Sequence, residues 1–313
     1  LAFVPENDPS HNLMNCNAKL RNNFTMDGGA AAYNYEFYFG PNDYYLLKDY
    51  DRKYEKTITI GGSIIGLITR FIIMPSFRWL NSLISNYGII ILVMTFLLKL
   101  IISPLTTKSY LSSAKMNAIK PEIDKLNEKF PKAASDQKEA MKKQQATMEL
   151  YRRAGINPAG GCLPMLLTFP LLWAMFRFFP VSIELRQQPF LWAEDLSTYD
   201  SIYDFGFRIL GMDHLSLFAL LMAVTMWFYS KTTMPKSTDP QMAPMRFMSV
   251  WLMPIMMFFI CNSLSAGLSY YYLLSNLFMM LQTFIIKKFV VKPEKILAQI
   301  EASKGKPLQK SKW

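Results

Sequence analysis

The stretch that decides the fold is residues 87–107, which read YGIIILVMTFLLKLIISPLTT. A helix needs about 20 residues to cross the hydrocarbon core of a bilayer, and this run is long and apolar enough to do so. Its one charged residue, Lys99, stands near the middle, where a lysine costs about 2.5–3.5 kcal/mol on insertion scales. No other long apolar run contains an acid that could pair with it. We therefore expect Lys99 to face a water-filled cleft; the alternative is a shallower position from which its ammonium reaches the cytoplasmic headgroups.

Four further apolar runs bring the expected membrane spans to five. They lie at about 160–180, 214–230, 247–262 and 266–286, and the last two are close enough to form a tight hairpin. Hydrophobic residues make up 51% of the 313 residues and the mean hydropathy is +0.12, between the values typical of soluble and of wholly embedded proteins. The sequence predicts an all-α polytopic membrane protein with five transmembrane helices around a hydrophilic groove.

The segments outside these spans have patterns of their own. Residues 1–57 are aqueous and β-rich: Tyr33, Tyr35, Phe37 and Phe39 alternate with polar neighbours, as in a strand. We expect this segment to be the C-terminal edge of a larger β domain, and we expect further residues before Leu1, because no targeting segment precedes it. Residues 58–86 predict an amphipathic helix in the membrane interface, interrupted by charges and by Pro75.

A long polar stretch follows the first span. Residues 108–156 predict two antiparallel helices in water with one apolar seam, and Asp136 is the expected N-cap of the second helix. The chain ends in a basic tail at 291–313.

Charge fixes the orientation of the spans. Residues 108–156 contain 11 basic and 6 acidic side chains, and the chain from Lys287 onward has eight lysines and two acids, whereas 181–213 has two basic and six acidic residues. Because basic loops stay in the cytoplasm, 108–156, 231–246 and the tail are expected inside, and 1–86 and 181–213 outside. The tail is expected to bind anionic lipids; ribosomal RNA is the alternative.

The sequence contains no motif of an enzyme or of a metal site. Its two histidines and three cysteines lack the spacing of a metal or nucleophile site, so no catalytic residue, cofactor or metal is expected. Other small polar residues can share a cleft with Lys99: Thr95, which lies four residues before it on the same helix face, and Thr168, Ser275, Asn276 and Gln282 of other spans.

Several stretches resemble the YidC/Oxa/Alb family of membrane protein insertases. Residues 95–106 with Ala114-Lys115-Met116 resemble the family's first core span, 157–164 the start of its next span, 184–197 the outer loop that follows, and 266–276 its last span. The resemblance covers about 87–290, and the segment before it is similar to the end of the periplasmic β domain and the interface helix of the Gram-negative bacterial members, rather than to the organelle forms. One residue departs from the pattern: Lys99 stands where the family most often has arginine, which keeps the charge but loses the bidentate fork.

The resemblance implies a function for the core at 87–290. It implies a groove open to the cytoplasm and to lipid and closed outside, in the bacterial inner membrane, through which nascent membrane proteins are inserted and folded, alone or with the Sec translocon. The ribosome and anionic lipids are further implied partners, and no small-molecule substrate is implied. The groove residues expected on this basis are Lys99, Thr95, Thr168, Tyr271, Tyr272, Ser275 and Asn276, and the expected sliding surface for a substrate helix comprises Leu172, Met253, Met256 and Met257.

Three other functions remain open at this point. The chain could be a translocon-associated assembly factor without insertion activity of its own. It could be an ion-coupled transporter with Lys99 as the coupling site, although the sequence shows no repeated halves. A membrane enzyme ranks last, because no nucleophile–base pair is apparent.

Overall fold

The chain divides into two units, Leu1–Pro41 and Asn42–Trp313. The computed structural model describes residues 2–3, 14–15, 19, 35–131, 133, 136–153, 163–209, 211–233 and 243–290. In the first unit, strands β1 (Ala2–Phe3) and β2 (Met14–Asn15) form a short antiparallel pair. Tyr33, the start of the second predicted span at 160–162 with the residues 154–159 before it, and the basic tail at 291–313 lie outside the described residues.

The strand predicted at 33–39 does not form over the described residues 35–39. The alternation itself is present, because the rings of Tyr35, Phe37 and Phe39 follow one another at 6.5 and 6.4 Å along one side of the chain. These rings are exposed, however, Phe39 to 92%. A strand needs a hydrogen-bonded neighbour, and the side-chain pattern alone does not provide one.

The amphipathic segment is a continuous helix rather than an interrupted one. It comprises α2 (Ser63–Ile68), a π-helical turn at Thr69–Ile73 and α3 (Met74–Asn81). The π turn lies directly before Pro75, whose missing N–H and bulky ring would otherwise disrupt the α-helical ladder. A short helix, α1 (Tyr44–Asp49), precedes this segment; the Asp43 carboxylate caps it by accepting hydrogen bonds from the N–H groups of Tyr45 and Leu46.

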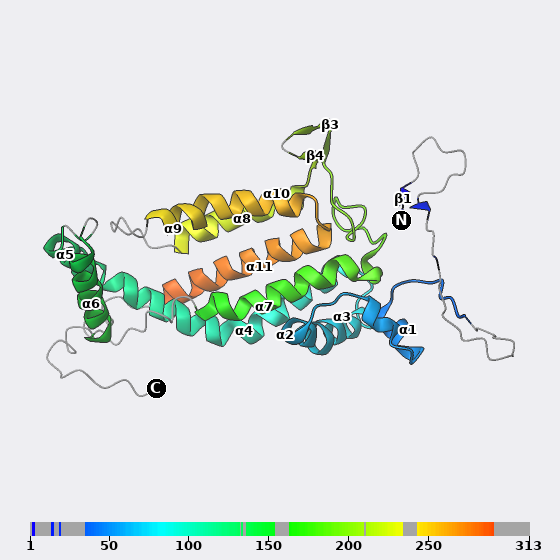
Figure 1. Cartoon of the computed structure of the whole chain (residues 1–313), viewed down its shortest axis with the longest axis horizontal. Helices are drawn as coiled ribbons and strands as arrows, with labels where there is room; N and C mark the ends of the chain where they lie inside the picture. Colours follow the sequence, from blue (N-terminus) through cyan, green and yellow to red (C-terminus); the bar gives the residue numbers. More distant parts are fainter. Residues whose placement is uncertain are drawn as a thin grey trace, which may run out of the picture. The chain divides into compact units, whose positions relative to one another are not determined.

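The five runs predicted as spans are helical wherever they are described, with one shifted boundary (Figure 1). The helices are α4 (Tyr87–Ala118), α7 (Leu163–Phe178), α8 (Leu217–Thr233), the continuous α9 (Ala243–Phe247), π turn (Met248–Leu252) and α10 (Met253–Asn262), and α11 (Ala266–Ile285), which continues into a π turn at Ile286–Val290. The third run was expected to begin at 214. Its helix begins at Leu217, because Met212–Leu215 forms strand β4, paired with β3 (Tyr203–Ile209).

Two of the described helices are long and apolar enough to cross a membrane, Tyr87–Lys108 and Ala243–Asn262. The apolar part of α7 is shorter, and α8 has 17 residues. Helix α11 is long but carries polar residues, because it is the central helix: its first half is buried, and it packs against α8 on one side and α4 on another (Figure 1). A helix surrounded by protein can retain polar groups that lipid would exclude.

The polar stretch between the first two spans forms helices α5 (Lys120–Lys129) and α6 (Gln137–Arg153), which pack against each other. Asp136 caps α6 as predicted, accepting a hydrogen bond from the Lys138 N–H at 2.8 Å. The first arm is not the single helix expected. It consists of the end of α4 and α5, separated at Ile119, because Pro121 cannot continue the hydrogen-bond ladder of α4.

The loop between α7 and α8 packs closely on the first turn of α4. A Cβ built on Gly88 would lie 2.0 Å from the Phe190 ring, so the loop reaches the helix only because this position is glycine. The Phe190 ring in turn contacts Tyr270 of α11 at 5.1 Å. Gly88 therefore allows the loop to bridge two helices.

We expect Gly88→Ala to destabilise the protein by about 1–3 kcal/mol, since an added methyl must displace a packed ring. The measurement is thermal unfolding of the detergent-solubilised protein. Gly62→Ala is the matched control, because a Cβ there meets nothing within 4 Å. Equal melting temperatures for the two variants would contradict the packing role of Gly88.

Candidate functional site

A polar stripe runs along the face of α4 that meets α11. Thr95, Lys99, Ser103 and Thr106 follow one another at spacings of four, four and three, which places them on one helix face. Thr95 is 2% exposed and donates to the carbonyl of Ile91 at 2.6 Å, so its hydroxyl is used within its own helix. The other three side chains contact α11.

Lys99 is buried in the seam between α4 and α11, with only 5% of its surface exposed. Its Nζ donates to the sulfur of Met279 on α11 at 3.6 Å, which is a weak acceptor. In the part of the chain that the structure describes, no carboxylate lies within ion-pair distance of this ammonium. A buried charge with so poor a partner is energetically costly and is poised to gain from any anionic or polar group that reaches it.

One helical turn further along the same seam, the Gln282 amide joins the two helices. Its nitrogen donates to Thr106 Oγ1 at 2.7 Å and to Ser103 Oγ at 2.9 Å. Because Met279 and Gln282 are three residues apart on α11, the sulfur that meets Lys99 and this amide share one face. Along this seam Lys99 is followed by the Ser103–Thr106 pair, which Gln282 joins to α11 beside Pro104.

The other predicted groove residues lie around α11 on more than one face. Tyr271 is fully buried, and its hydroxyl has no hydrogen-bond partner among the described residues. The Tyr272 hydroxyl donates to the carbonyl of Leu172 on α7 at 3.5 Å, and the Asn276 amide donates to the carbonyl of Met222 on α8 at 3.3 Å. Ser275 and Thr168 are buried as well. Thus α11 connects α4, α7 and α8 through polar side chains, whereas Asn276 faces α8 and not Lys99.

The predicted sliding surface is partly exposed. On α10, Met256 is 44% exposed, while Met253 and Met257 are half-buried, as is Leu172 on α7. The exposed side of the same helix continues through further large apolar residues, namely Met248, Trp251, Leu252, Ile255 and Ile260. Only 17% of the apolar stretch within Ala243–Asn262 is buried inside the protein, so this helix presents a long apolar side to its surroundings.

At the opposite end from the Gln282 contact, a loop closes over the start of α11. The first N–H groups of this helix, on Ala266 and Gly267, donate to the carbonyls of Thr198 and Leu196 at 2.6 and 2.9 Å. Side-chain capping is absent at Ser265, so loop backbone takes its place. We call the loop 182–202 with β3 and β4 the outer loop, after the side of the membrane on which its acidic charge predicts it.

A buried carboxylate anchors the outer loop. Asp200, 3% exposed, accepts hydrogen bonds from Ser216 Oγ at 2.5 Å, Trp192 Nε1 at 2.9 Å and the Phe218 N–H at 3.0 Å. Ser216 Oγ also accepts from the Ala219 N–H at 3.0 Å, which makes it the N-cap of α8. Asp200 and Ser216 together satisfy the start of α8, and the negative charge lies where the helix dipole favours it.

A second polar group links α8 to the end of α10. The Asn262 side chain accepts from the Ser216 N–H and donates to the His214 carbonyl, both at 2.9 Å. His214 Nε2 lies 2.7 Å from the Asn262 carbonyl oxygen and Nδ1 lies 2.6 Å from the Asp213 carboxylate, so both ring nitrogens face acceptors. The bond with His214 lowers the pKa of the Asp213 carboxyl below its usual value. We call Asp200, Ser216, His214 and Asn262 the polar clasp.

The polar clasp, Met279 and the pairing of Gln282 with Ser103 and Thr106 were not predicted from the sequence. One signal was available, since Ser216 stands immediately before the apolar run 217–230, the position of an N-cap. No such signal exists for Asn262 or Met279, whose contacts join residues far apart in the chain.

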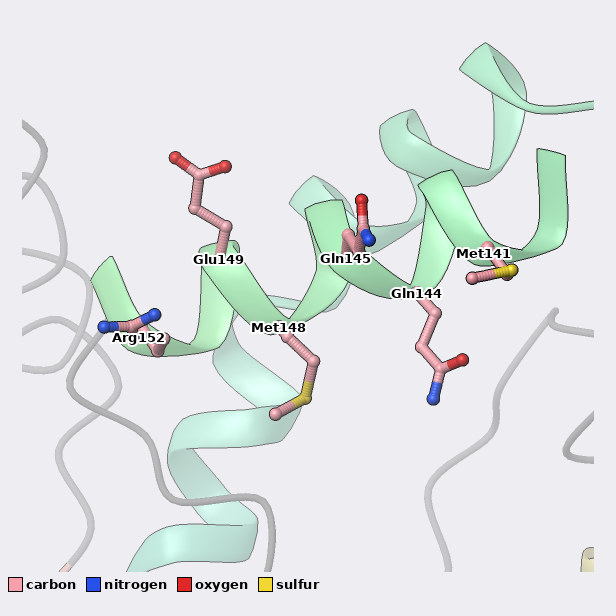
Figure 2. A pocket seen from close by; sticks show the side chains of 6 residues that line it. All are labelled: Met141, Gln144, Gln145, Met148, Glu149 and Arg152. Carbon is pink, nitrogen blue, oxygen red and sulfur yellow. The ribbon is translucent and has the colours of Figure 1, made fainter. Parts of the chain in front are cut away.

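A separate hollow of about 670 Å³ lies on helix α6, lined by Met141, Gln144, Gln145, Met148, Glu149 and Arg152. Gln144 and Met148 project from one side of α6 and Glu149 from the other (Figure 2). Met141 and Met148 are 58% and 44% exposed. Flexible, uncharged methionines of this kind suit partners of varied shape.

Comparisons with known proteins agree on one family. The sequence model described as "60Kd inner membrane protein" matches residues 79–294. The chain is 44% identical over 297 residues to a protein of Parabacteroides distasonis named "Membrane protein insertase YidC", covering 90% of this chain and 46% of that protein. It is 46% identical over 287 residues to the protein of the same name from Bacteroides fragilis, covering 88% and 45%.

The fold has a counterpart among solved structures. The chain is similar to an "Active YidC insertase crystal structure with the first transmembrane domain resolved", with a TM-score of 0.52 and 24% identity, over 80% of this chain and 54% of that one. At this identity the likeness concerns the fold alone. The chain spans about half the length of the curated relatives that it matches.

Proposed function

The chain belongs to the 60Kd inner membrane protein family, and from this premise we propose that it forms the core of an insertase that moves nascent membrane proteins into the bacterial inner membrane. The chain is a mostly helical polytopic membrane protein, as its family and its fold require. The proposed action is non-enzymatic: it lowers a transfer barrier and makes or breaks no covalent bond.

The observation that carries the proposal is the buried ammonium of Lys99. It lies between α4 and α11 with a thioether as its hydrogen-bond partner. An acidic or polar residue of a substrate that enters the seam gains a charge-assisted contact, which offsets part of its own dehydration. The membrane potential adds about 2.3 kcal/mol per unit charge per 100 mV, and it favours outward movement of an acidic segment.

The proposed groove has five transmembrane helices and is closed on the outer side. The acidic segment 181–213 would lie outside, and the basic segments 108–156, 231–246 and 291–313 in the cytoplasm. Closure outside is supported by the outer loop, whose carbonyls hold the start of α11, and by the polar clasp. Entry from the cytoplasm is supported by the polar residues that follow Lys99 along the seam, Ser103 and Thr106, which Gln282 joins to α11.

Other residues of the groove have proposed roles that follow from their positions. Thr95, Thr168, Tyr271, Tyr272, Ser275 and Asn276 would line or support the polar interior. Leu172 with Met253, Met256 and Met257 would offer the substrate helix an apolar surface on which to slide into lipid. The exposed apolar side of α10 supports this assignment, because a substrate helix needs an accessible apolar surface to slide along. Ordinary lipid contact would use the same surface.

The proposed partners are nascent membrane proteins, the ribosome, the Sec translocon and anionic lipids. The methionines around the hollow on α6 suit a first contact with an emerging apolar segment (Figure 2). The relatives are named membrane protein insertases, which supports nascent membrane proteins as the proposed substrates of this chain.

A translocon-associated assembly factor is the second candidate, because the same cleft could hold a client without moving it. Reconstitution decides between the two. We expect the purified chain, alone in liposomes of inner-membrane composition, to insert a small single-span substrate. The outer tail of the inserted substrate is then protected from protease on one side of the liposome membrane, external or luminal, and that side depends on the orientation of insertion. No protection without added Sec proteins, and recovery of protection with them, would identify an assembly factor.

A further inference from the structure

The cytoplasmic-side ends of α8, α9 and α11 form a concentrated basic surface. The described residues of α8, of Ala243–Asn262 and of α11 with its π turn include four basic side chains, Lys231, Arg246, Lys287 and Lys288, and no acidic one. All four lie toward one end of the helix bundle: the three lysines near the C-terminal ends of their helices, and Arg246 near the N-terminal end of an antiparallel one. A random arrangement of surface charge would place some of them elsewhere or would pair them with acids.

Contacts between the helices bring these residues together. Lys287 Nζ donates to the carbonyl of Thr232 at 2.8 Å, which places it beside Lys231 at the C-terminus of α8. The Trp227 ring on α8 contacts the Trp251 ring of the neighbouring π turn at 5.7 Å. Lys231 comes one turn after Trp227, and Arg246 one turn before Trp251 on the antiparallel helix, so both lie beyond the tryptophan pair on the same side.

Aromatic rings hold two of the lysines. The Lys231 ammonium lies 4.4 Å from the centre of the Trp227 ring, and Lys288 lies 5.7 and 5.5 Å from the rings of Phe284 and Phe289. A lysine over an aromatic face is restricted but keeps its charge available to an anion. Phe284 and Phe289 are 59% and 66% exposed, and the exposed surface continues as apolar side chains along α11, including Leu281.

We propose that Lys231, Lys287 and Lys288 form a headgroup site for an anionic phospholipid. The phosphate would contact the lysines, and the acyl chains would lie along the exposed apolar side formed by Leu281, Phe284 and Phe289. Basic residues next to apolar and aromatic surface at a membrane boundary match both halves of a lipid, whereas RNA would match the charges alone. The inference rests on the membrane location of the family and not on insertase activity.

The test is titration of the purified full chain in neutral detergent with a fluorescent phosphatidylglycerol. We expect Lys231→Gln/Lys287→Gln to weaken binding about thirtyfold, since each lysine near an anionic surface contributes about a fivefold factor. The matched control is Lys138→Gln/Lys142→Gln on α6, which removes the same charge and should leave binding unchanged. Lys231→Arg/Lys287→Arg should also bind normally, which excludes misfolding as the cause.

Competition identifies the ligand. Unlabelled phosphatidylglycerol should displace the probe, while phosphatidylcholine, inorganic phosphate and polyuridylate should not. Equal loss of binding in the α6 control would show diffuse charge attraction and would overturn the site. Displacement by phosphate or by polyuridylate would assign the lysines to a free anion or to RNA and would overturn the lipid assignment. Because none of these readouts uses insertion, they stand apart from the test of the proposed function.

Discussion

Replacing Lys99 with glutamate is expected to reduce insertion of substrates with acidic outer tails by a factor on the order of 30 to 5,000, whereas Lys99→Arg should retain most activity. Glutamate removes the attraction and adds repulsion in a buried seam, where losing one partner of a charge contact costs about 2–5 kcal/mol. Arginine keeps the positive charge and adds donors for a carboxylate. The measurement is complementation of an insertase-depleted strain, with protease mapping of two reporters that differ only in the charge of the outer tail.

The reporter pair distinguishes mechanism from damage. A variant that merely misfolds should fail equally with acidic and neutral tails, whereas loss of a charge contact should affect mainly the acidic one. Lys99→Met separates loss of attraction from repulsion, and it fits the apolar part of the seam beside Met279. If wild type, Lys99→Arg and Lys99→Glu insert both reporters alike, Lys99 has no part in substrate transfer.

Replacing Asp200 with alanine is expected to destabilise the protein by about 3–5 kcal/mol. Its carboxylate accepts from Ser216, Trp192 and the Phe218 N–H while only 3% exposed, and each buried donor left without an acceptor costs about 1–3 kcal/mol. Chemical unfolding of the solubilised protein, followed by tryptophan fluorescence, measures the loss. Trp192 reports directly, because it is one of the three donors.

The matched control is Asp204→Ala. Asp204 lies in the same outer loop and accepts a hydrogen bond from Ser201 Oγ at 2.6 Å, but it is exposed. Water can replace its contacts, so its removal should change stability by less than about 0.5 kcal/mol. Asp200→Asn should fall between the two, because it retains one acceptor oxygen. Equal stability of the Asp200 and Asp204 variants would show that the polar clasp does not hold the outer loop.

The helices could be predicted from the sequence because their signals are local. The runs of apolar residues, the position of Lys99 within 87–107 and the capping residue Asp136 depend on neighbours a few residues away. The breaks at prolines were harder. Pro75 was expected to interrupt its helix, yet a π turn absorbs it, while Pro121 does separate α4 from α5. Which outcome occurs depends on packing around the turn and not on the proline itself.

The contacts that define the candidate site could not be predicted, because they join distant segments. Gln282 meets Ser103, Asn262 meets His214, and Lys99 meets Met279 only after the helices have packed. Strand β4 was missed because a span was expected to start at 214, and its partner β3 was missed with it. The alternation at 35–39 shows the opposite error, since a correct local pattern predicted a strand that has no ladder in the described chain.

The hydrogen bonds from Ala266 and Gly267 to the carbonyls of Thr198 and Leu196 have a consequence for the order in which the fold can form during synthesis. During synthesis, residues 196–198 emerge before 199–265 have been made, so their donors do not yet exist. A chain stalled anywhere upstream of α11 lacks both the donors that hold the outer loop and the central helix against which α4 and α8 pack. The packing of the other helices is therefore complete only once α11, the last of them to be synthesised, has been added.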